Sequence, residues 1–209
     1  MSADRPSRTA HHGNRHGRSE QARRAVLEAA DDLLAERGFA GVTIEGIAAR
    51  AGVAKQTIYR WWSSKVDVLI EAFVDDMAQH LTPPDEGDLE SELRTHLRRS
   101  ARFLTRSDPG AVFRALAGQA QHDPEMAERF RTECLGPQRA LDRRPLERAI
   151  ERGELPPDTD VDFALDQLVG PLYYRVLVTG HPVPEEFTDA LVERFLAPFR
   201  TRRAAEPRA

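Results

Sequence analysis

Cysteine is nearly absent from this chain of 209 residues, which contains Cys134 alone. A single cysteine excludes an internal disulfide, and no spacing of cysteine and histidine resembles a zinc site. The chain also lacks an apolar run of the about 18 residues that span a bilayer, because Arg175 interrupts the stretch 169–178. The first twenty residues are polar and lack the apolar segment of a secretory signal. We therefore expect a cytoplasmic protein without membrane attachment, metal ion or cofactor.

Lysine is scarce as well, with Lys55 and Lys65 only, so the basic charge comes almost entirely from arginine. The net charge of −4 hides an asymmetry, since residues 1–65 contain 11 basic and 7 acidic side chains and residues 66–209 contain 19 and 27. A basic first third before an acidic remainder suggests that only the first part contacts a polyanion. Charge also fluctuates along any chain, so this asymmetry needs the support of a motif.

Signals for β-strands are missing too, because neither strict alternation nor a hairpin turn occurs. Apolar residues instead recur at helical spacing, which predicts an all-α protein. About nine helices are expected, at 19–37, 44–51, 55–61, 64–80, 88–106, 108–121, 123–152, 160–179 and 184–200. Gly136-Pro137 and Pro145 should kink or split the long helix 123–152.

The same pattern predicts the domain organisation. Residues 1–18 are polar and basic and are expected to form a disordered arm. Residues 19–65 form a three-helix domain, and residues 66–202 form a larger helical body that is reached through a linker helix at about 64–80. Residues 203–209 are expected to be a disordered tail.

The segment 43–62 carries the most specific motif. Thr43 is a good N-cap for a first short helix, Gly52 permits a tight turn, and Val53 fills the angle before a second short helix. That second helix should bury Ile58 and one of the two tryptophans, and its outward face is polar, basic and aromatic. Ser64-Lys65-Val66-Asp67 then forms a capping box for the linker helix. The layout predicts a helix-turn-helix that binds DNA, with an ordinary helical corner as the alternative.

These residues, with the preceding helix end at Gly38-Phe39, resemble the TetR family of bacterial transcriptional regulators. The resemblance is strong over residues 19–80 and only architectural beyond them. It implies DNA contacts from the helix-turn-helix and the start of the linker helix. Their chemistry agrees, because lysine and tyrosine suit phosphates, glutamine suits an adenine edge, and a threonine methyl suits thymine. The expected DNA-binding residues are Thr43, Lys55, Gln56, Thr57, Tyr59, Arg60, Trp61 and Lys65.

Two positions depart from the family pattern. Ala54 stands where many members have a serine that caps the recognition helix, and loss of a cap costs about 1 kcal/mol. Trp61 stands where a histidine is common, so its side chain either follows the DNA backbone or packs within the domain.

For the body, the resemblance implies a homodimer and a pocket for a small-molecule effector. The helices 160–179 and 184–200 are more apolar than one helix face requires, which suits a dimer interface, or else the interior of a monomer. A pocket is expected among helices 88–179, although each candidate also suits ordinary core, as does Cys134. The candidate lining residues are Phe103, Phe113, Gln119, Phe130 and Tyr174.

The sequence therefore predicts a dimeric repressor that binds a palindromic operator and is released by a small molecule. A ligandless architectural DNA-binding protein is the alternative. An enzyme is not expected, since the chain lacks a glycine-rich phosphate loop, His-Glu-x-x-His and Gly-x-Ser-x-Gly. The acidic pairs Asp31-Asp32 and Asp75-Asp76 should point to different helix faces and be solvated.

Overall fold

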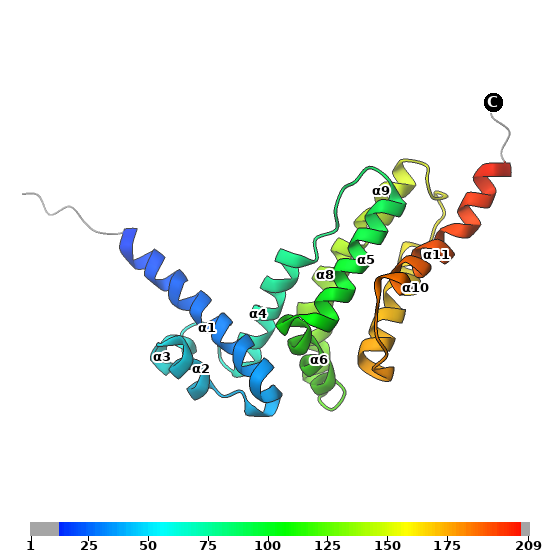
Figure 1. Cartoon of the computed structure of the whole chain (residues 1–209). Coiled ribbons are helices and arrows are strands. Elements are labelled where there is room, and N and C mark those ends of the chain that lie inside the picture. Colours follow the sequence, from blue (N-terminus) through cyan, green and yellow to red (C-terminus); the bar gives the residue numbers. More distant parts are fainter. Residues whose placement is uncertain (1–12, 206–209) are drawn as a thin grey trace, which may run out of the picture.

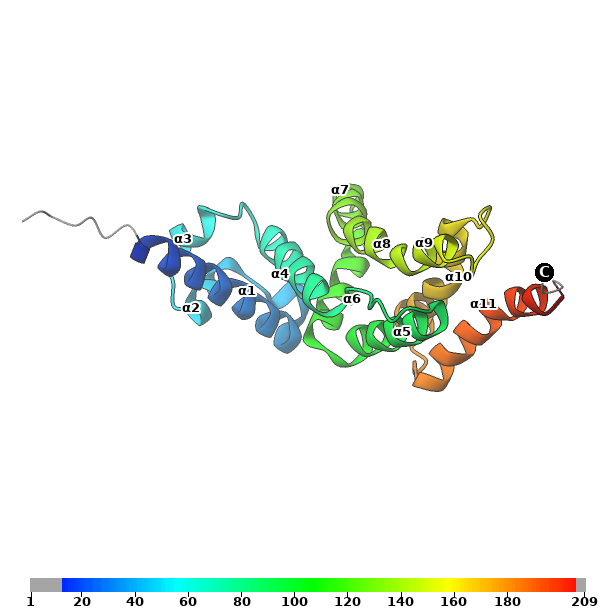
Figure 2. The same ribbon diagram turned by 90° about the horizontal axis from the view of Figure 1, so that it is seen from above.

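The computed structural model describes the backbone of residues 13–205 and the side chains of residues 18–200, and all regular elements in this part are helical. The first four helices, α1 to α4, occupy one end of an elongated molecule, and α10 and α11 lie at the other end (Figures 1 and 2). Their bounds are α1 Gly13–Gly41, α2 Ile44–Ala51, α3 Lys55–Tyr59, α4 Lys65–His80, α5 Leu89–Arg106, α6 Asp108–Ala120, α7 Pro124–Arg129, α8 Gly136–Asp142, α9 Arg144–Glu151, α10 Val161–Tyr173 and α11 Glu185–Ala205. Two π-helical turns, η1 (Phe130–Leu135) and η2 (Tyr174–Thr179), continue α7 and α10. With continuous segments counted together, the described part contains nine helices, as predicted.

The two ends of the described chain differ from the prediction. Helix α1 begins at Gly13 rather than Ser19, and α11 continues to Ala205. Extending an existing helix adds one hydrogen bond for each residue fixed, so a helix can continue through a polar segment. Residues 1–12 of the predicted arm and 206–209 of the predicted tail lie outside the described residues. Gly38 interrupts α1 with φ 66°, at the position predicted for the end of this helix.

The predicted kinks in the helix 123–152 are present. Gly136-Pro137 lies where η1 passes into α8, and Pro145 lies in the first turn of α9. Proline lacks an N–H and disturbs the preceding helical turn, which explains the change of helix type before Pro137. Pro171 within α10 likewise precedes η2.

A continuous apolar core joins the helix-turn-helix region to the body. In the first three helices it contains Val26, Leu33, Ile47 and Ile58, all at most 2% exposed. Helix α4 extends it through Leu69 and Phe73, and α1 packs on both α4 and α6. The linker helix therefore contacts both parts, so a displacement of α4 would change its packing on the helix-turn-helix region and on the body.

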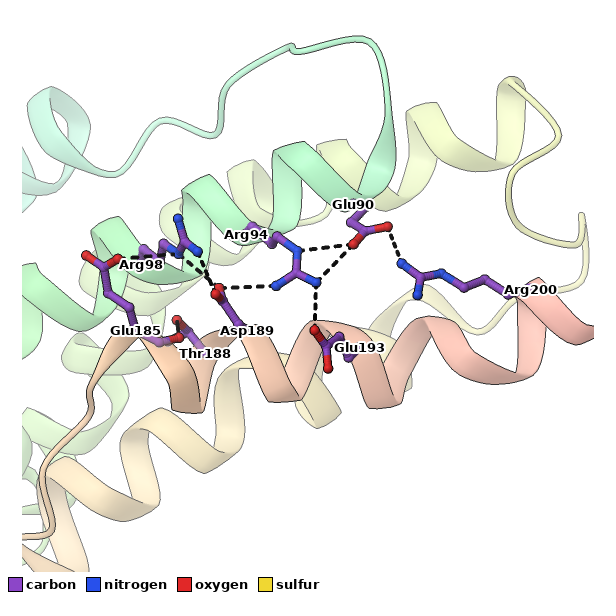
Figure 3. Close-up of polar contacts among 8 residues, drawn as sticks. All are labelled: Glu90, Arg94, Arg98, Glu185, Thr188, Asp189, Glu193 and Arg200. Carbon is purple, nitrogen blue, oxygen red and sulfur yellow. Dashed lines mark hydrogen bonds and ion pairs between the residues drawn. The ribbon is translucent and has the colours of Figure 1, made fainter.

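Ion pairs fasten α11 to α5 (Figure 3). Arg94 lies 3.0 Å from Glu90 and 3.1 Å from Glu193, and it also pairs with Asp189. Arg98 donates to both carboxylate oxygens of Asp189. Further pairs of this ladder are Arg98–Glu185, Arg102–Glu185 and Arg200–Glu90. Ion pairs between α5 and α11, most of them with the arginine on α5, thus fix the last helix against the body.

Candidate nucleic-acid interface

Helix α2 is held at both ends as the sequence predicts. The hydroxyl oxygen of Thr43 accepts a hydrogen bond from the backbone N–H of Gly46 at 3.0 Å. Gly52 adopts a left-handed conformation with φ 65° and donates its N–H to the carbonyl of Ala48. A side chain at this position would be strained, whereas glycine accepts the conformation without cost. The turn therefore fixes the angle at which α3 leaves α2.

Helix α3 is short, and buried side chains determine its position. Ile58 is fully buried and Trp62 is 3% exposed, so Trp62 is the tryptophan that faces inward. Its indole Nε1–H donates to a carboxylate oxygen of Glu71 on α4 at 2.6 Å, and Arg23 of α1 pairs with the same carboxylate. The N-cap Ala54 makes no side-chain capping bond, as expected. Packing and the Trp62 anchor thus compensate for the missing cap.

The outward side of α3 presents the predicted DNA-binding residues together. Lys55, Gln56, Tyr59 and Arg60 are exposed, and Thr57 and Trp61 are partly exposed beside them. Tyr59 is 55% exposed, so its ring and hydroxyl are accessible from outside. Trp61 packs edge-on against Trp62, with 5.3 Å between the ring centres, so it has a packing role in the free protein. This face combines positive charge, hydrogen-bonding groups and an aromatic ring, which suits a DNA groove.

Lys55 has a partner within the protein. Its ammonium lies 2.6 Å from a carboxylate oxygen of Glu45 on α2. The hydrogen bond to Glu45 raises the pKa of Lys55 and lowers the pKa of Glu45. Lys55 is therefore charged, and a DNA phosphate would have to compete with Glu45 for it. Sequence reasoning did not identify Glu45, because its proximity to Lys55 depends on the angle between α2 and α3.

Lys65 is engaged within the domain. Its ammonium donates to the carbonyl oxygens of Phe39 at 2.8 Å and Val42 at 2.9 Å, and it lies 4.5 Å from the centre of the Phe39 ring. Burial lowers the pKa of Lys65. These contacts tie the start of α4 to the connection between α1 and α2. Lys65 thus has a structural role in the free protein, and its contact with DNA stays a prediction.

The linker helix is attached to the body at its first turn. The capping box is present, since the side chain of Ser64 accepts from the backbone N–H of Asp67 and the side chain of Asp67 accepts from the backbone N–H of Ser64. The other carboxylate oxygen of Asp67 lies 2.8 Å from the guanidinium of Arg129 on α7. Arg129 also pairs with Glu133. One arginine of the body therefore contacts both Glu133 and the residue that caps α4. This connection was not evident from the sequence, where the two residues are 62 positions apart.

Two of the four predicted solvated carboxyl groups are paired across α1 and α4. Asp32 and Asp75 are exposed, but Asp31 and Asp76 are partly buried and face each other. Burial, with Asp76 nearby, raises the pKa of Asp31 to about 8, and burial also raises the pKa of Asp76. The prediction of solvated side chains was wrong for these two, because the packing of α1 on α4 brings them together. At neutral pH the carboxyl group of Asp31 is therefore largely protonated, in the contact between α1 and the linker helix.

A small cavity of about 20 Å³ lies in the body among α4, α5, α6, α8 and α10. Of the predicted lining residues, Phe103 and Phe113 line it, and Phe130 packs behind Phe113 with ring centres 5.7 Å apart. Gln119 does not line it, and Tyr174 is 59% exposed on the outer surface. Tyr173 takes the place expected for Tyr174 and stacks on Phe113. One position along a helix rotates a side chain by about 100°, which accounts for the exchange.

The cavity has a polar corner as well as aromatic walls. Gln138 of α8 donates its amide N–H groups to Asp142 at 2.5 Å and to the carbonyl of Leu81, the C-cap residue of α4, at 3.1 Å. A ring nitrogen of His96 on α5 contacts Asp142 at 2.8 Å, and its Nδ1 is buried without a partner among the described residues. Hydrogen bonds therefore connect the end of the linker helix to the centre of the body.

A capped helix-turn-helix with an exposed basic and aromatic second helix, carried by a larger helical body, defines a DNA-binding transcriptional regulator. Residues 26–72 match the family described as bacterial regulatory proteins of the tetR family, and residues 83–195 match the tetracyclin repressor-like C-terminal domain. The chain belongs to the TetR family of transcriptional regulators.

Similar proteins are regulators of the same kind. An uncharacterized HTH-type transcriptional regulator of Bacillus subtilis, YdeS, is 41% identical over 175 residues, which cover 84% of this chain and 88% of YdeS. The DNA-binding transcriptional repressor TetR of Mycobacteroides abscessus is 31% identical, covering 86% of this chain and 94% of that protein. The crystal structure of the TetR family regulator SCO0332 matches with a TM-score of 0.74 and 36% identity, over 85% of this chain and 97% of that one. These relatives are transcriptional regulators, a class distinct from enzymes.

Two further findings concern the rest of the chain. Among the helices described, none is long and apolar enough to cross a membrane. Cys134 is fully buried, and burial raises its pKa to about 12. The thiol is therefore protonated at neutral pH and behaves as a small apolar core residue.

Proposed function

We propose that the protein is a homodimeric repressor that acts in the cytoplasm on a palindromic operator and is released by a small-molecule effector. The observation that carries the proposal is the distribution of exposed large apolar side chains. Within the described residues there are five, of which Tyr59 lies on α3. The other four, Phe163, Tyr174, Leu177 and Val178, lie on α10 and η2. One molecule thus has one candidate surface for DNA and one for a second copy.

The dimer surface combines α10, η2 and α11. Phe163 is 62% and Val178 is 69% exposed. A contiguous group of exposed apolar side chains marks a surface that contacts another molecule. Helix α11 adds Leu191, Phe195 and Phe199, which are only partly buried. Two-fold pairing through these helices would present two copies of α3, and a palindrome has the matching symmetry. Recognition helices of such dimers enter successive major grooves about 34 Å apart.

The route from effector to DNA runs through α4. Phe73 and Met77 of α4 line the cavity, and the carbonyl of Leu81 is held by Gln138. A ligand that enlarges the cavity would displace α4, and with it the Lys65 and Trp62 contacts that orient α3. Linkage requires that such a ligand bind the displaced conformation more tightly, and DNA then weakens ligand binding by the same factor.

The size of the cavity favours a second candidate function. A cavity of about 20 Å³ holds about one water molecule, so an effector must first open the body. A ligandless DNA-binding regulator with a closed body needs no such opening. A thermal-shift screen separates the two, because a ligand at a hundred times its Kd stabilises the folded state by about 2.7 kcal/mol.

The test of the leading proposal is selection of DNA duplexes from genomic fragments by the purified protein, followed by sedimentation of the complex. We expect an inverted repeat in the selected sequences and two chains bound to each duplex. Val178→Glu should weaken dimerisation and duplex binding together, whereas Arg99→Gln, an exposed change on α5, should affect neither. Selected duplexes without an inverted repeat, bound by a single chain, would contradict the proposal.

A further inference from the structure

A cleft lies in the body, and none of its lining residues belongs to α1, α2, α3 or α4. It has a volume of about 380 Å³ and is formed by the end of α5, by α6 and by the connection between η2 and α11. Four basic residues line it, namely Arg106, Arg114, Arg175 and His181. Apolar residues, including Leu104 and Val176, line it as well. The cleft is therefore amphipathic.

Two of these arginines are held in place by neutral partners. Arg114 donates to the carbonyl of Leu104 at 2.6 Å. Arg175 donates to the carbonyl of Pro182 at 2.6 Å, and its guanidinium lies 3.5 Å from the centre of the Phe187 ring. A carbonyl or a ring neutralises no charge and occupies only part of the five N–H donors of a guanidinium. Both groups are thus oriented and retain free donors.

The three arginines are also without acidic partners in the described part of the chain. None of them forms an ion pair there, and no carboxylate is among the described residues that line the cleft. Most other arginines of the body are paired with carboxylates, as in the ladder between α5 and α11 (Figure 3). Arg106 lies at the end of the same α5 helix, beyond that ladder. Three arginines without an acidic partner among the described residues therefore line this one cleft.

We propose that the cleft binds an amphipathic organic anion, with its carboxylate or phosphate on the guanidinium groups and its apolar part against Leu104 and Val176. The planar fork of arginine matches both anionic groups and can bind them through two parallel hydrogen bonds. Leu104 also lines the aromatic cavity that contains Phe73 of α4. A bound anion therefore lies one side chain from the linker helix. Its role as the effector rests on the function proposed above, whereas its binding does not.

Binding is tested by calorimetric titration of the full chain with octanoate, octyl phosphate, 1-octanol and inorganic phosphate. We expect one site per chain for octanoate or octyl phosphate, and whichever binds more tightly identifies the head group. Inorganic phosphate and 1-octanol should bind at least about tenfold more weakly, since each lacks one half of the interaction. Arg106→Gln combined with Arg114→Gln should weaken the anion by about tenfold or more, because charge-assisted hydrogen bonds are lost.

The controls separate the site from folding and from the effector role. Arg99→Gln removes an equal charge from α5 outside the cleft and should bind like the wild type, and Arg106→Lys should retain much of the affinity. Equal circular dichroism spectra and unfolding midpoints establish folding. Equal affinity for 1-octanol, or unchanged anion affinity in the double variant, would overturn the proposal. Weaker duplex binding by the double variant without any anion would also overturn it, by assigning the cleft to DNA phosphates. Anion binding without release of the duplex would leave the site intact and contradict only the effector role.

Discussion

Replacing Lys65 by methionine tests how the DNA-binding domain is held together. The ammonium of Lys65 donates to two backbone carbonyls, of Phe39 and Val42, and lies over the Phe39 ring. Hydrogen bonds of a charged group contribute about 1.5–3 kcal/mol each, and an exposed cation–π contact contributes about 0.5–1 kcal/mol. Burial lowers the pKa of Lys65, which shows that desolvation of the charge offsets part of this gain. We expect Lys65→Met to lose about 2 kcal/mol of unfolding free energy.

The assay is urea denaturation of the wild type, Lys65→Met and Lys65→Arg, with duplex affinity measured at a temperature where all three are fully folded. A loss of about 2 kcal/mol lowers the melting temperature of a chain of this size by about 5 °C. Arginine can reach the same carbonyls and should restore most of the stability. An unchanged stability of Lys65→Met with a large loss of duplex affinity would refute the reasoning, because Lys65 would then act on DNA rather than as a clamp.

Three further changes test other contacts. Glu45→Gln frees Lys55 from its partner and removes a negative charge from the face proposed to bind DNA. Duplex affinity at low salt, measured by fluorescence anisotropy, should therefore rise severalfold. An unchanged affinity would show that Lys55 does not contact phosphates. The pKa of Asp31, about 8 in the folded chain against 3.8 ordinarily, means that the folded state holds the extra proton, so stability falls as pH rises from about 4 through 8. Asp31→Asn should flatten this fall in denaturation curves at pH 5 and pH 9, and equal slopes would contradict the pairing with Asp76. Glu92 is fully buried and pairs with Arg148 and Arg152. Glu92→Met leaves these two cations without their acceptor and should lower the free energy of unfolding by about 3 kcal/mol in urea denaturation. A loss below about 1 kcal/mol would exclude a structural role for the cluster.

The local features of the DNA-binding domain could be predicted from the sequence because each depends on a few neighbouring residues. Thr43 as an N-cap, Gly38 and Gly52 at helix ends, and the capping box of Ser64 and Asp67 are all present. Intrinsic preferences act over three or four residues, and they decide these positions without help from the tertiary structure. The burial of Ile58 also follows from helical spacing.

Contacts between helices could not be predicted in the same way. The partner of Trp62 is Glu71, and the pairing of Asp31 with Asp76 depends on how α1 crosses α4. The exchange of Tyr174 for Tyr173 in the body depends on a single helical position. Such features depend on crossing angles and helix register, which apolar periodicity leaves open within one residue or so.

The central claim is that the outward face of α3 binds DNA. The duplex affinity of Tyr59→Ala and Lys55→Ala tests it most directly, at concentrations where both variants are dimers. Both side chains are exposed and support no core packing, so the unfolding midpoints should equal that of the wild type. Fluorescence anisotropy with the selected duplex should show about a tenfold or greater loss of affinity for each variant. Wild-type affinity in both variants would contradict the assignment of α3 as the recognition helix.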